Sequence, residues 1–271
     1  MSRRRLKDKG MAKKVDMHLH TTYSDGLLSP EKMVEHCFSK GITEMAITDH
    51  DSVGGVVEGE ITAKKFGIKF HRGVEISTFM KFEKGRVGIH LLGYDIDIEN
   101  KKLREIFRFL KKDRQESNEK VFSFVERDFN ISKEEIIKSK NTDYIGKPDI
   151  GRVLVSKGFF KDLDQAFKEY FSKGEIGKIH RGSVEIERAI EAVSESGGYS
   201  VLAHPAFIKV GEKGSRERFD AIENIVREAR DKGVTGIEAM YFRNTGKETE
   251  FLCNLAQREN MIITQGSDYH G

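Results

Sequence analysis

Cysteine and proline are scarce in this sequence. Its 271 residues include two cysteines, Cys37 and Cys253, and three prolines. Both cysteines lie on segments with a helical apolar pattern, far apart along the chain, so we expect reduced, buried thiols rather than a disulfide framework. The few prolines leave no proline-rich linker.

Membrane and secretion signals are missing as well. No apolar run approaches the roughly 20 residues that span a bilayer, and the basic N-terminus has no apolar core after its charges, as a secretory signal would. We therefore predict a cytoplasmic protein with no membrane partner and no obligatory protein partner. The sequence also lacks a P-loop, a dinucleotide-binding glycine motif, zinc-finger spacing and a nucleophile elbow.

The net charge of +3 comes from the N-terminus. Residues 1–14 hold seven Lys or Arg side chains and one acid, whereas the rest of the chain is slightly acidic. We predict that residues 1–14 form a basic, disordered extension, to which we assign no function. A slightly acidic body without an extended basic groove argues against long duplex nucleic acid as a substrate.

Strand-like and helical patterns alternate from residue 15 onward. The alternation predicts parallel βαβ units, and hence an α/β sheet or barrel. Several predicted helices end at a glycine, where a left-handed cap is expected. These glycines are Gly41, Gly67, Gly197 and Gly233. The strand-like runs are residues 44–49, 69–77, 87–95, 198–205, 234–241 and 261–268, and the helical runs are 30–40, 55–66, 185–196, 216–232 and 247–259.

One long interval breaks this alternation. Between residues 98 and 184 no strand-like run occurs, and a long amphipathic helix is followed by shorter helical pieces. We predict that residues 98–184 form an inserted helical subdomain, and that residues 15–97 and 185–271 form the barrel domain.

Imidazole and carboxylate side chains recur where the predicted strands end. His18 and His20 share one face of a strand end because strand side chains alternate, and Asp25 lies on the loop that follows. In parallel barrels such strand ends converge on one face. The full set of nine candidates is His18, His20, Asp25, His50, Glu75, His90, His204, Asp268 and His270.

Each of these residues taken alone has an ordinary structural explanation, such as a hydrogen-bonded pair, a core histidine or a turn. Nine of them in one pocket cannot be packed without compensation, because burying unpaired charge is costly. Cations resolve the conflict. Imidazole and carboxylate ligands without thiolate suit Mn, Fe or Zn, with Mg as an alternative. Since nine ligands exceed the three or four of one catalytic zinc, we expect two or three divalent ions.

The motifs around these residues resemble those of the polymerase and histidinol phosphatase (PHP) superfamily. They are "DMHLHTTYSDG", "AITDHD", "GVEIS", "IHLLGYD", "VLAHP" and "GSDYHG". The resemblance covers residues 15–271, and the helical insert resembles the branch of nucleoside bisphosphate phosphatases and oligonucleotide 5′-exonucleases. It implies a distorted (β/α)7 barrel with an inserted helical subdomain and a trinuclear metal site. Because the family usually continues beyond the last motif, we expect a truncated C-terminus.

The resemblance also implies which residues bind each ion. The first ion would bind His18, His20, Glu75 and Asp268, the second Glu75, His90 and His204, and the third Asp25, His50 and His270. The implied catalytic residues are Asp25, Glu75, His90 and His270. A metal-bridging hydroxide, its pKa lowered by two cations, would attack phosphorus, so no serine or cysteine nucleophile is required.

Three further residues are predicted to bind substrate by the same resemblance. Arg114 and Asn118 lie four residues apart, on one face of the long helix, and Lys147 lies in "YIGKPDIGR". That motif usually has arginine and histidine where this chain has Lys147 and Asp149. Lysine can still meet a phosphate as a point charge, whereas an aspartate beside an anionic substrate is unfavourable.

The predicted function is hydrolysis of a phosphomonoester of a small metabolite or nucleotide, with a nucleoside bisphosphate as one candidate. The first alternative is a 5′-to-3′ exonuclease that hydrolyses phosphodiesters of short oligonucleotides. The second alternative is a non-catalytic, metal-binding regulatory module, against which the complete ligand set argues. The partner of the site is therefore a phosphorylated metabolite, a nucleotide or a short oligonucleotide.

Overall fold

The computed structural model describes residues 13–271 apart from 83–84, 141, 181 and 213. The predicted N-terminal extension, residues 1–14, lies outside the described residues except for its last two. The described strands form a nearly closed barrel in the order β1-β2-β3-β4-β6-β7-β8, and the short β5 pairs with β3. The predicted α/β barrel is thus confirmed. Its strands are β1 Val15–Asp16, β2 Glu44–Ile47, β3 Lys69–Phe82, β4 Gly85–Tyr94, β5 Val184–Glu185, β6 Tyr199–Leu202, β7 Gly236–Tyr241 and β8 Ile262–Gly266.

The barrel closes where the first strand meets the last. The Met17 N–H donates to the Gln265 carbonyl at 3.0 Å, and Leu19 and Tyr269 form an isolated parallel bridge. The buried Tyr94 hydroxyl, from β4, donates to the Met17 carbonyl at 2.9 Å. These contacts bring the residues after β1 beside those after β8, although they lie near opposite ends of the sequence.

The prediction of parallel strands is wrong at β4. The pairs β1–β2, β2–β3, β6–β7 and β7–β8 are parallel, but β4 is antiparallel to both β3 and β6. In the β3–β4 hairpin, Glu75 lies opposite Leu92 and Ser77 lies opposite His90. A parallel crossover needs about a dozen residues or more, and the link between Phe82 and Gly85 is too short for one.

Helices with one apolar face cover the barrel. Helix α8 buries Ile186, Ala189, Ile190 and Val193, the spacing that places side chains on one side of a helix. All four predicted glycine positions have left-handed backbone angles, with φ between 69° and 106°, so these predicted caps are confirmed. The helices around the barrel are α1 Pro30–Ser39, α2 Val56–Phe66, α8 Ile186–Glu195, α9 Arg216–Asp231 and α10 Gly246–Arg258, with the 3₁₀ turn η2 Pro205–Phe207 after β6.

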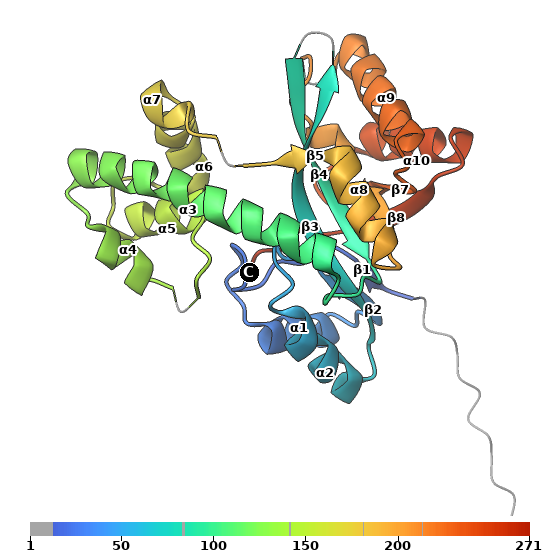
Figure 1. Cartoon of the computed structure of the whole chain (residues 1–271), viewed down its shortest axis with the longest axis horizontal. Coiled ribbons are helices and arrows are strands. Elements are labelled where there is room, and N and C mark those ends of the chain that lie inside the picture. The colour runs from blue at the N-terminus through green and yellow to red at the C-terminus, as the bar shows by residue number, and fades with distance from the viewer. Residues whose placement is uncertain (1–12, 83–84, 141, 181, 213) are drawn as a thin grey trace, which may run out of the picture.

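The regular elements among the described residues between β4 and β5 are all helical, and they gather on one side of the barrel (Figure 1). Helix α3 runs through both parts, because Leu103 and Ile106 pack in the barrel core while Val121 and Phe122 pack in a second core within the insert. The division of the chain at residues 98 and 184 stays a prediction. The helical elements are α3 Lys101–Phe129, α4 Lys133–Lys138, α5 Lys147–Ser156, α6 Leu163–Ala166, the π-helical turn η1 Phe167–Phe171 and α7 Gly174–Gly177.

Membrane-spanning helices are not found in the described part of the chain. None of its helices combines the length and the apolar character needed to cross a bilayer.

Candidate metal centre

The nine predicted ligands converge at one end of the barrel. His18 and His20 follow β1, Asp25 lies before α1, His50 follows β2, Glu75 and His90 lie within β3 and β4, His204 follows β6, and Asp268 and His270 follow β8. The imidazole rings are neighbours: ring centroids lie 4.2 Å apart for His20 and His270, and 5.5 Å apart for His90 and His204. His90 reaches this end from the middle of β4, where it pairs with Ser77, two residues after Glu75 on β3.

Glu75 is the centre of the cluster and is fully buried. Its Oε2 lies 3.0 Å from His50 Nδ1, 3.2 Å from His20 Nε2 and 3.3 Å from His18 Nε2. Its Oε1 lies 2.8 Å from His90 Nδ1 and 3.0 Å from His204 Nε2. One carboxylate thus faces five imidazole nitrogens, a number that its lone pairs could not satisfy by well-aligned hydrogen bonds.

Carboxylates also lie on either side of Glu75. Asp268 Oδ1 is 3.0 Å from His20 Nε2 and 3.4 Å from His18 Nε2. Asp25 Oδ1 is 3.2 Å from His270 Nε2. Within the described part of the chain, the side chains that could hold a metal ion form three overlapping groups: His18, His20, Glu75 and Asp268; His50, Glu75 and His90; and His20, Asp25, His50 and His270.

Hydrogen bonds at the far ring nitrogens fix the tautomers of several histidines. The Ser24 hydroxyl donates to Asp49 at 2.6 Å, so it accepts from His20 Nδ1, 3.2 Å away. His270 Nδ1 donates to the Asp268 carbonyl at 2.8 Å. In the neutral form of each ring, the other nitrogen, Nε2, is a lone pair directed at the cluster, the arrangement of metal-binding histidines.

The unpartnered atoms of the cluster fit bound cations. Among the described residues, Asp25 Oδ1, His50 Nδ1 and Glu75 Oε2 are buried without a hydrogen-bond partner. Two of them, His50 Nδ1 and Glu75 Oε2, are 3.0 Å apart but are not aligned as a hydrogen bond. The Nε2 atoms of His18 and His20 face each other at 3.1 Å. Buried polar atoms are almost always satisfied, so atoms that converge without hydrogen bonds indicate metal coordination.

The pKa values of the cluster without metal show that protons occupy the places that metal cations would take. Burial lowers the pKa of His20, but Asp268 and Glu75 outweigh burial and raise it to about 10. Burial dominates at His50 and lowers its pKa to about 3. Burial would raise the pKa of Glu75, but the surrounding imidazoles hold it well below its usual range. Protons therefore compensate the carboxylates without metal, and metal binding would release them.

Backbone strain marks two of the nine positions. His204 and Asp268 have φ angles of 31° and 52°, a region that non-glycine residues rarely adopt. Such strain concentrates at functional sites, where the surrounding structure enforces it.

Sequence reasoning missed Glu238, a fully buried residue on β7. Its Oε1 accepts from His18 Nδ1 at 3.0 Å, and its Oε2 accepts from the His204 backbone N–H at 2.9 Å. Glu238 thus orients two of the predicted ligands, by binding His18 at the ring nitrogen that faces away from Glu75 and His204 at its backbone N–H. The signal in the sequence was a single acid inside the apolar run "GIEAMY".

The predicted substrate-binding residues differ in their surroundings. Arg114 is buried against Asp51 at 3.4 Å and lies over the Tyr144 ring, 4.0 Å from its centroid. The Asn118 side chain donates to the Ile145 carbonyl at 2.8 Å. The Lys147 ammonium donates to the Ile179 carbonyl at 3.0 Å, and Lys147 lines a cavity of about 570 Å³ that His90 also lines.

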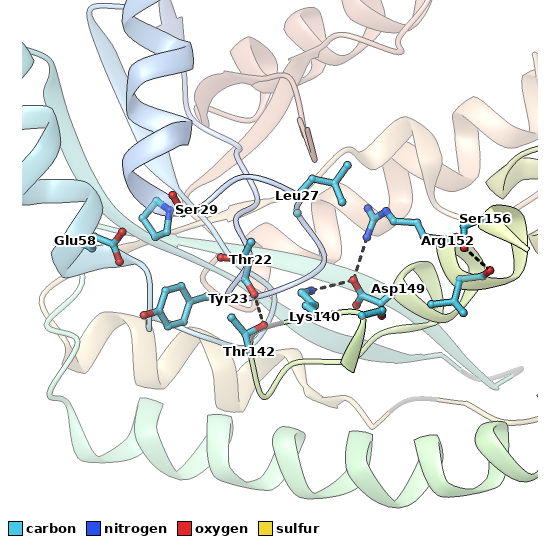
Figure 2. Close-up of a pocket in the computed structure, with 14 residues that line it drawn as sticks. Thr22, Tyr23, Leu27, Ser29, Glu58, Lys140, Thr142, Asp149, Arg152 and Ser156 are labelled. Carbon is cyan, nitrogen blue, oxygen red and sulfur yellow. Dashed lines mark hydrogen bonds and ion pairs between the residues drawn. The ribbon is translucent and has the colours of Figure 1, made fainter. Parts of the chain in front are cut away.

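Asp149 is engaged in an ion-pair cluster on the insert (Figure 2). Its carboxylate binds Lys140 Nζ at 2.9 Å and Arg152 Nη1 at 3.0 Å, and it accepts from the Gly146 N–H at 2.8 Å, which caps helix α5. The negative charge of Asp149 is therefore balanced by two cationic side chains and by the N-terminus of helix α5.

Comparisons with known proteins identify what the chain resembles. A model of the PHP domain matches residues 16–231. A 5′-3′ exoribonuclease of Haemophilus influenzae is 29% identical, over 96% of this chain and 91% of its own. A 3′,5′-nucleoside bisphosphate phosphatase of Chromobacterium violaceum is 26% identical, over 94% of this chain and 87% of its own.

Two solved structures share the fold over nearly the whole chain. An amidohydrolase from Chromobacterium violaceum superimposes with a TM-score of 0.84 and 25% identity, covering 95% of this chain and 87% of that one. A protein from Bifidobacterium adolescentis, described as a putative metal-dependent phosphoesterase, gives a TM-score of 0.81 and 27% identity, covering 96% and 89%.

Proposed function

The chain belongs to the PHP domain family, and on this premise we propose that it hydrolyses a phosphomonoester of a small metabolite or nucleotide, a nucleoside bisphosphate being one candidate. The predicted family and the predicted class, a metal-dependent phosphoric ester hydrolase, are confirmed by the family match and by relatives named for hydrolysing phosphate esters. The identity of the ester is the proposal.

The observation that carries the proposal is the convergence on Glu75. Five imidazole nitrogens lie within 3.3 Å of its two oxygens, and three buried cluster atoms have no hydrogen-bond partner among the described residues. Nine donors exceed the three or four protein ligands of one catalytic zinc, and the resemblance to the PHP family implies three divalent ions, which we assign as Mn, Fe or Zn with Mg as an alternative. The first would bind His18, His20, Glu75 and Asp268, the second Glu75, His90 and His204, and the third Asp25, His50 and His270.

Divalent ions at such a site would activate water and neutralise charge on the phosphate oxygens. The catalytic roles go to Asp25, Glu75, His90 and His270. Glu75 joins the two sides of the cluster through its two oxygens. The His90 and His270 side chains are 36% and 29% exposed, whereas those of His18 and His20 are fully buried. Substrate therefore reaches the cluster from the side of His90 and His270.

Basic side chains beside His90 support an anionic substrate. Lys147, His180 and Lys209 line the cavity of about 570 Å³ that includes His90, and no Asp or Glu of the described chain lines it. We assign Lys147 to a phosphate group of the substrate. We likewise assign Arg114 and Asn118 to substrate binding. Arg114 is held by Asp51 of the barrel at 3.4 Å, and Asn118 is held by the Ile145 carbonyl of the insert at 2.8 Å.

A second candidate function is 5′-to-3′ exonuclease activity on short oligonucleotides. His90 and Lys209 also line an adjoining cavity of about 460 Å³, in which Arg86 and Phe207 take part. Together the two cavities are lined by the cationic side chains of Lys147, Lys209 and Arg86 and by the aromatic ring of Phe207. His90 of the cluster lines both. Nucleic-acid backbones and bases bind to such surfaces.

The decisive experiment is metal analysis of the purified protein, followed by a Mn²⁺-supplemented screen. The panel holds phosphomonoesters, nucleoside bisphosphates and short oligonucleotides. Inorganic phosphate from monoesters alone supports the first function, and mononucleotides released from oligomers support the exonuclease. If no compound of the panel is hydrolysed, the result supports the non-catalytic module.

Two variants test whether the cluster performs the reaction. Glu75→Gln and His90→Ala should each abolish turnover, because each removes a donor from the centre. Glu191→Gln, in an exposed ion pair with Lys102 on the barrel surface, is the control that should leave turnover unchanged. Retention of most activity by either cluster variant would reject the assignment.

A further inference from the structure

The loop that carries Asp25 is held from two directions. On the barrel side, Asp49 accepts from the Thr21 N–H at 2.7 Å, from the Thr21 hydroxyl at 2.6 Å and from the Ser24 hydroxyl at 2.6 Å. These bonds fix the beginning of the loop. They do not reach the backbone of Asp25 itself.

On the other side, the loop is held by the insert. Thr142 donates its hydroxyl to the Thr22 carbonyl at 2.6 Å, and Arg152 Nη2 donates to the Asp25 carbonyl at 2.7 Å. The Lys140 ammonium donates a hydrogen bond to the Ser24 carbonyl. Three successive parts of the loop thus accept hydrogen bonds from side chains more than a hundred residues away. We call Lys140, Thr142, Asp149 and Arg152 the insert latch (Figure 2).

Asp149 organises the two cations of the latch. Its carboxylate is 5% exposed and holds both the Lys140 ammonium and the Arg152 guanidinium, whose side chains are 9% and 24% exposed. Each cation then uses its remaining N–H groups on the loop carbonyls. Arginine suits this double role because its planar group presents several donors in a fixed geometry.

The insert latch lies apart from the metal cluster. Lys140, Thr142, Asp149 and Arg152 line a cavity of about 650 Å³ that none of the nine predicted ligands lines. The latch therefore acts through the loop backbone rather than by touching the cluster. At the cluster end of the loop, Asp25 Oδ1 is 3.2 Å from His270 Nε2 and 4.0 Å from His50 Nε2, the donors assigned to the third ion.

We infer that the insert latch positions Asp25 and thereby sets the affinity of the third ion site, an inference that rests on the proposed three-ion assignment. Functional side chains have to be held within about 0.5 Å of their working geometry. The other two sites draw their ligands from residues on or beside the barrel strands, which the latch does not touch. Lys140, Thr142, Asp149 and Arg152 are thus positioning residues for one divalent cation, and the insert is part of the apparatus that assembles the metal centre.

The test uses the full chain and Mn²⁺ alone. Thr142→Val removes one hydroxyl without changing the side-chain shape, and Arg152→Met removes the donors but keeps an unbranched apolar side chain. Stoichiometry and affinity are measured by equilibrium dialysis with metal analysis. We expect each variant to weaken one of three ions by about 10- to 100-fold, the usual effect of removing a group that orients a ligand. The other two ions should bind as in the unchanged protein.

A matched variant separates positioning from folding. Lys157 lies at the end of helix α5, where its ion pair with Glu135 of α4 joins two parts of the insert without reaching the loop. Lys157→Met should leave all three ions bound. Arg152→Lys should recover part of the lost affinity. In the latch variants, excess Mn²⁺ should restore kcat while KM for the substrate stays unchanged.

The inference is overturned if both latch variants bind the third ion normally, if all three ions weaken alike, or if Lys157→Met weakens the third ion as much. It is also overturned if the unchanged protein binds fewer than three ions. An unchanged protein that binds three ions, loses one in the latch variants and hydrolyses no phosphate ester rejects the proposed function and supports the latch.

Discussion

Replacing Glu238 by glutamine gives a direct test of how the barrel orients its ligands. Glu238 is fully buried and accepts hydrogen bonds from His18 Nδ1 at 3.0 Å and from the His204 N–H at 2.9 Å. Both partners are donors, whereas a glutamine side chain offers one acceptor oxygen and one donor amide. One of the two donors must then face an N–H₂ group.

The size of the effect follows from this mismatch. A buried donor left unsatisfied costs about 1–3 kcal/mol, so the free energy of unfolding of Glu238→Gln should fall by about that amount. Loss of a group that orients a ligating histidine lowers metal affinity by about 10- to 100-fold. Because His18 is assigned to the first ion and His204 to the second, one of these two ions should weaken while the third is retained.

Urea denaturation and Mn²⁺ titration measure the two effects separately. The matched control is Glu248→Gln, another buried acid, which caps helix α10 by accepting from the Thr245 N–H at 2.7 Å and from its hydroxyl at 2.9 Å. This control should lose stability but keep its metal affinity. If Glu238→Gln loses no more metal affinity than Glu248→Gln, Glu238 does not orient the ligands.

Three further predictions concern a close contact, an ion pair and a thiol. Gly266→Ala should lower both metal content and melting temperature, because a Cβ there would lie 2.4 Å from the Glu238 carboxylate; Gly88→Ala, whose Cβ would meet nothing within 4 Å, should change neither. The hydrogen bond from Lys69 lowers the pKa of Glu44 to about 2 from its ordinary value of 4.5. The stability that this residue contributes is therefore complete above pH 4.5 and lost as the pH falls toward 2, so thermal melts of the unchanged protein and of Glu44→Gln should converge across that window. Burial raises the pKa of the Cys37 thiol to about 12; at pH 8 it should react with a thiol reagent only after unfolding, and rapid reaction in the native state would contradict its burial.

Much of the fold could be predicted because each local pattern agreed with the final structure. The alternation of helical and strand-like runs located the barrel elements, and the glycines marked helix ends. The direction of β4 could have been inferred too, since the interval between the predicted strands ending at residue 77 and starting at residue 87 is too short for a parallel crossover of a dozen or more residues. The polar residues in that interval concealed the continuation of β3 to Phe82.

The nine candidate ligands were recognisable because several short motifs occurred together in order. Glu238 and Asp149 were harder to interpret, for different reasons. Glu238 is a single acid in a buried strand, and only the closed barrel shows that His18 lies beside it. Asp149 was predicted to disfavour an anionic substrate, but its role depends on Lys140 and Arg152, whose side chains meet it only once the insert has folded. Tertiary partners of this kind leave no periodic signal in a sequence.

The seam between β1 and β8 has a consequence for biosynthesis. His18 and Asp268, assigned to one ion, come from opposite sides of that seam. A nascent chain leaving the ribosome has the first half of this site long before the second, so the assigned ion would have no complete set of ligands until the last strand has been translated. With that assignment, binding of the ion and closure of the barrel would be a single late event, in which His18 and Asp268 would hold the ion from the two edges of the barrel.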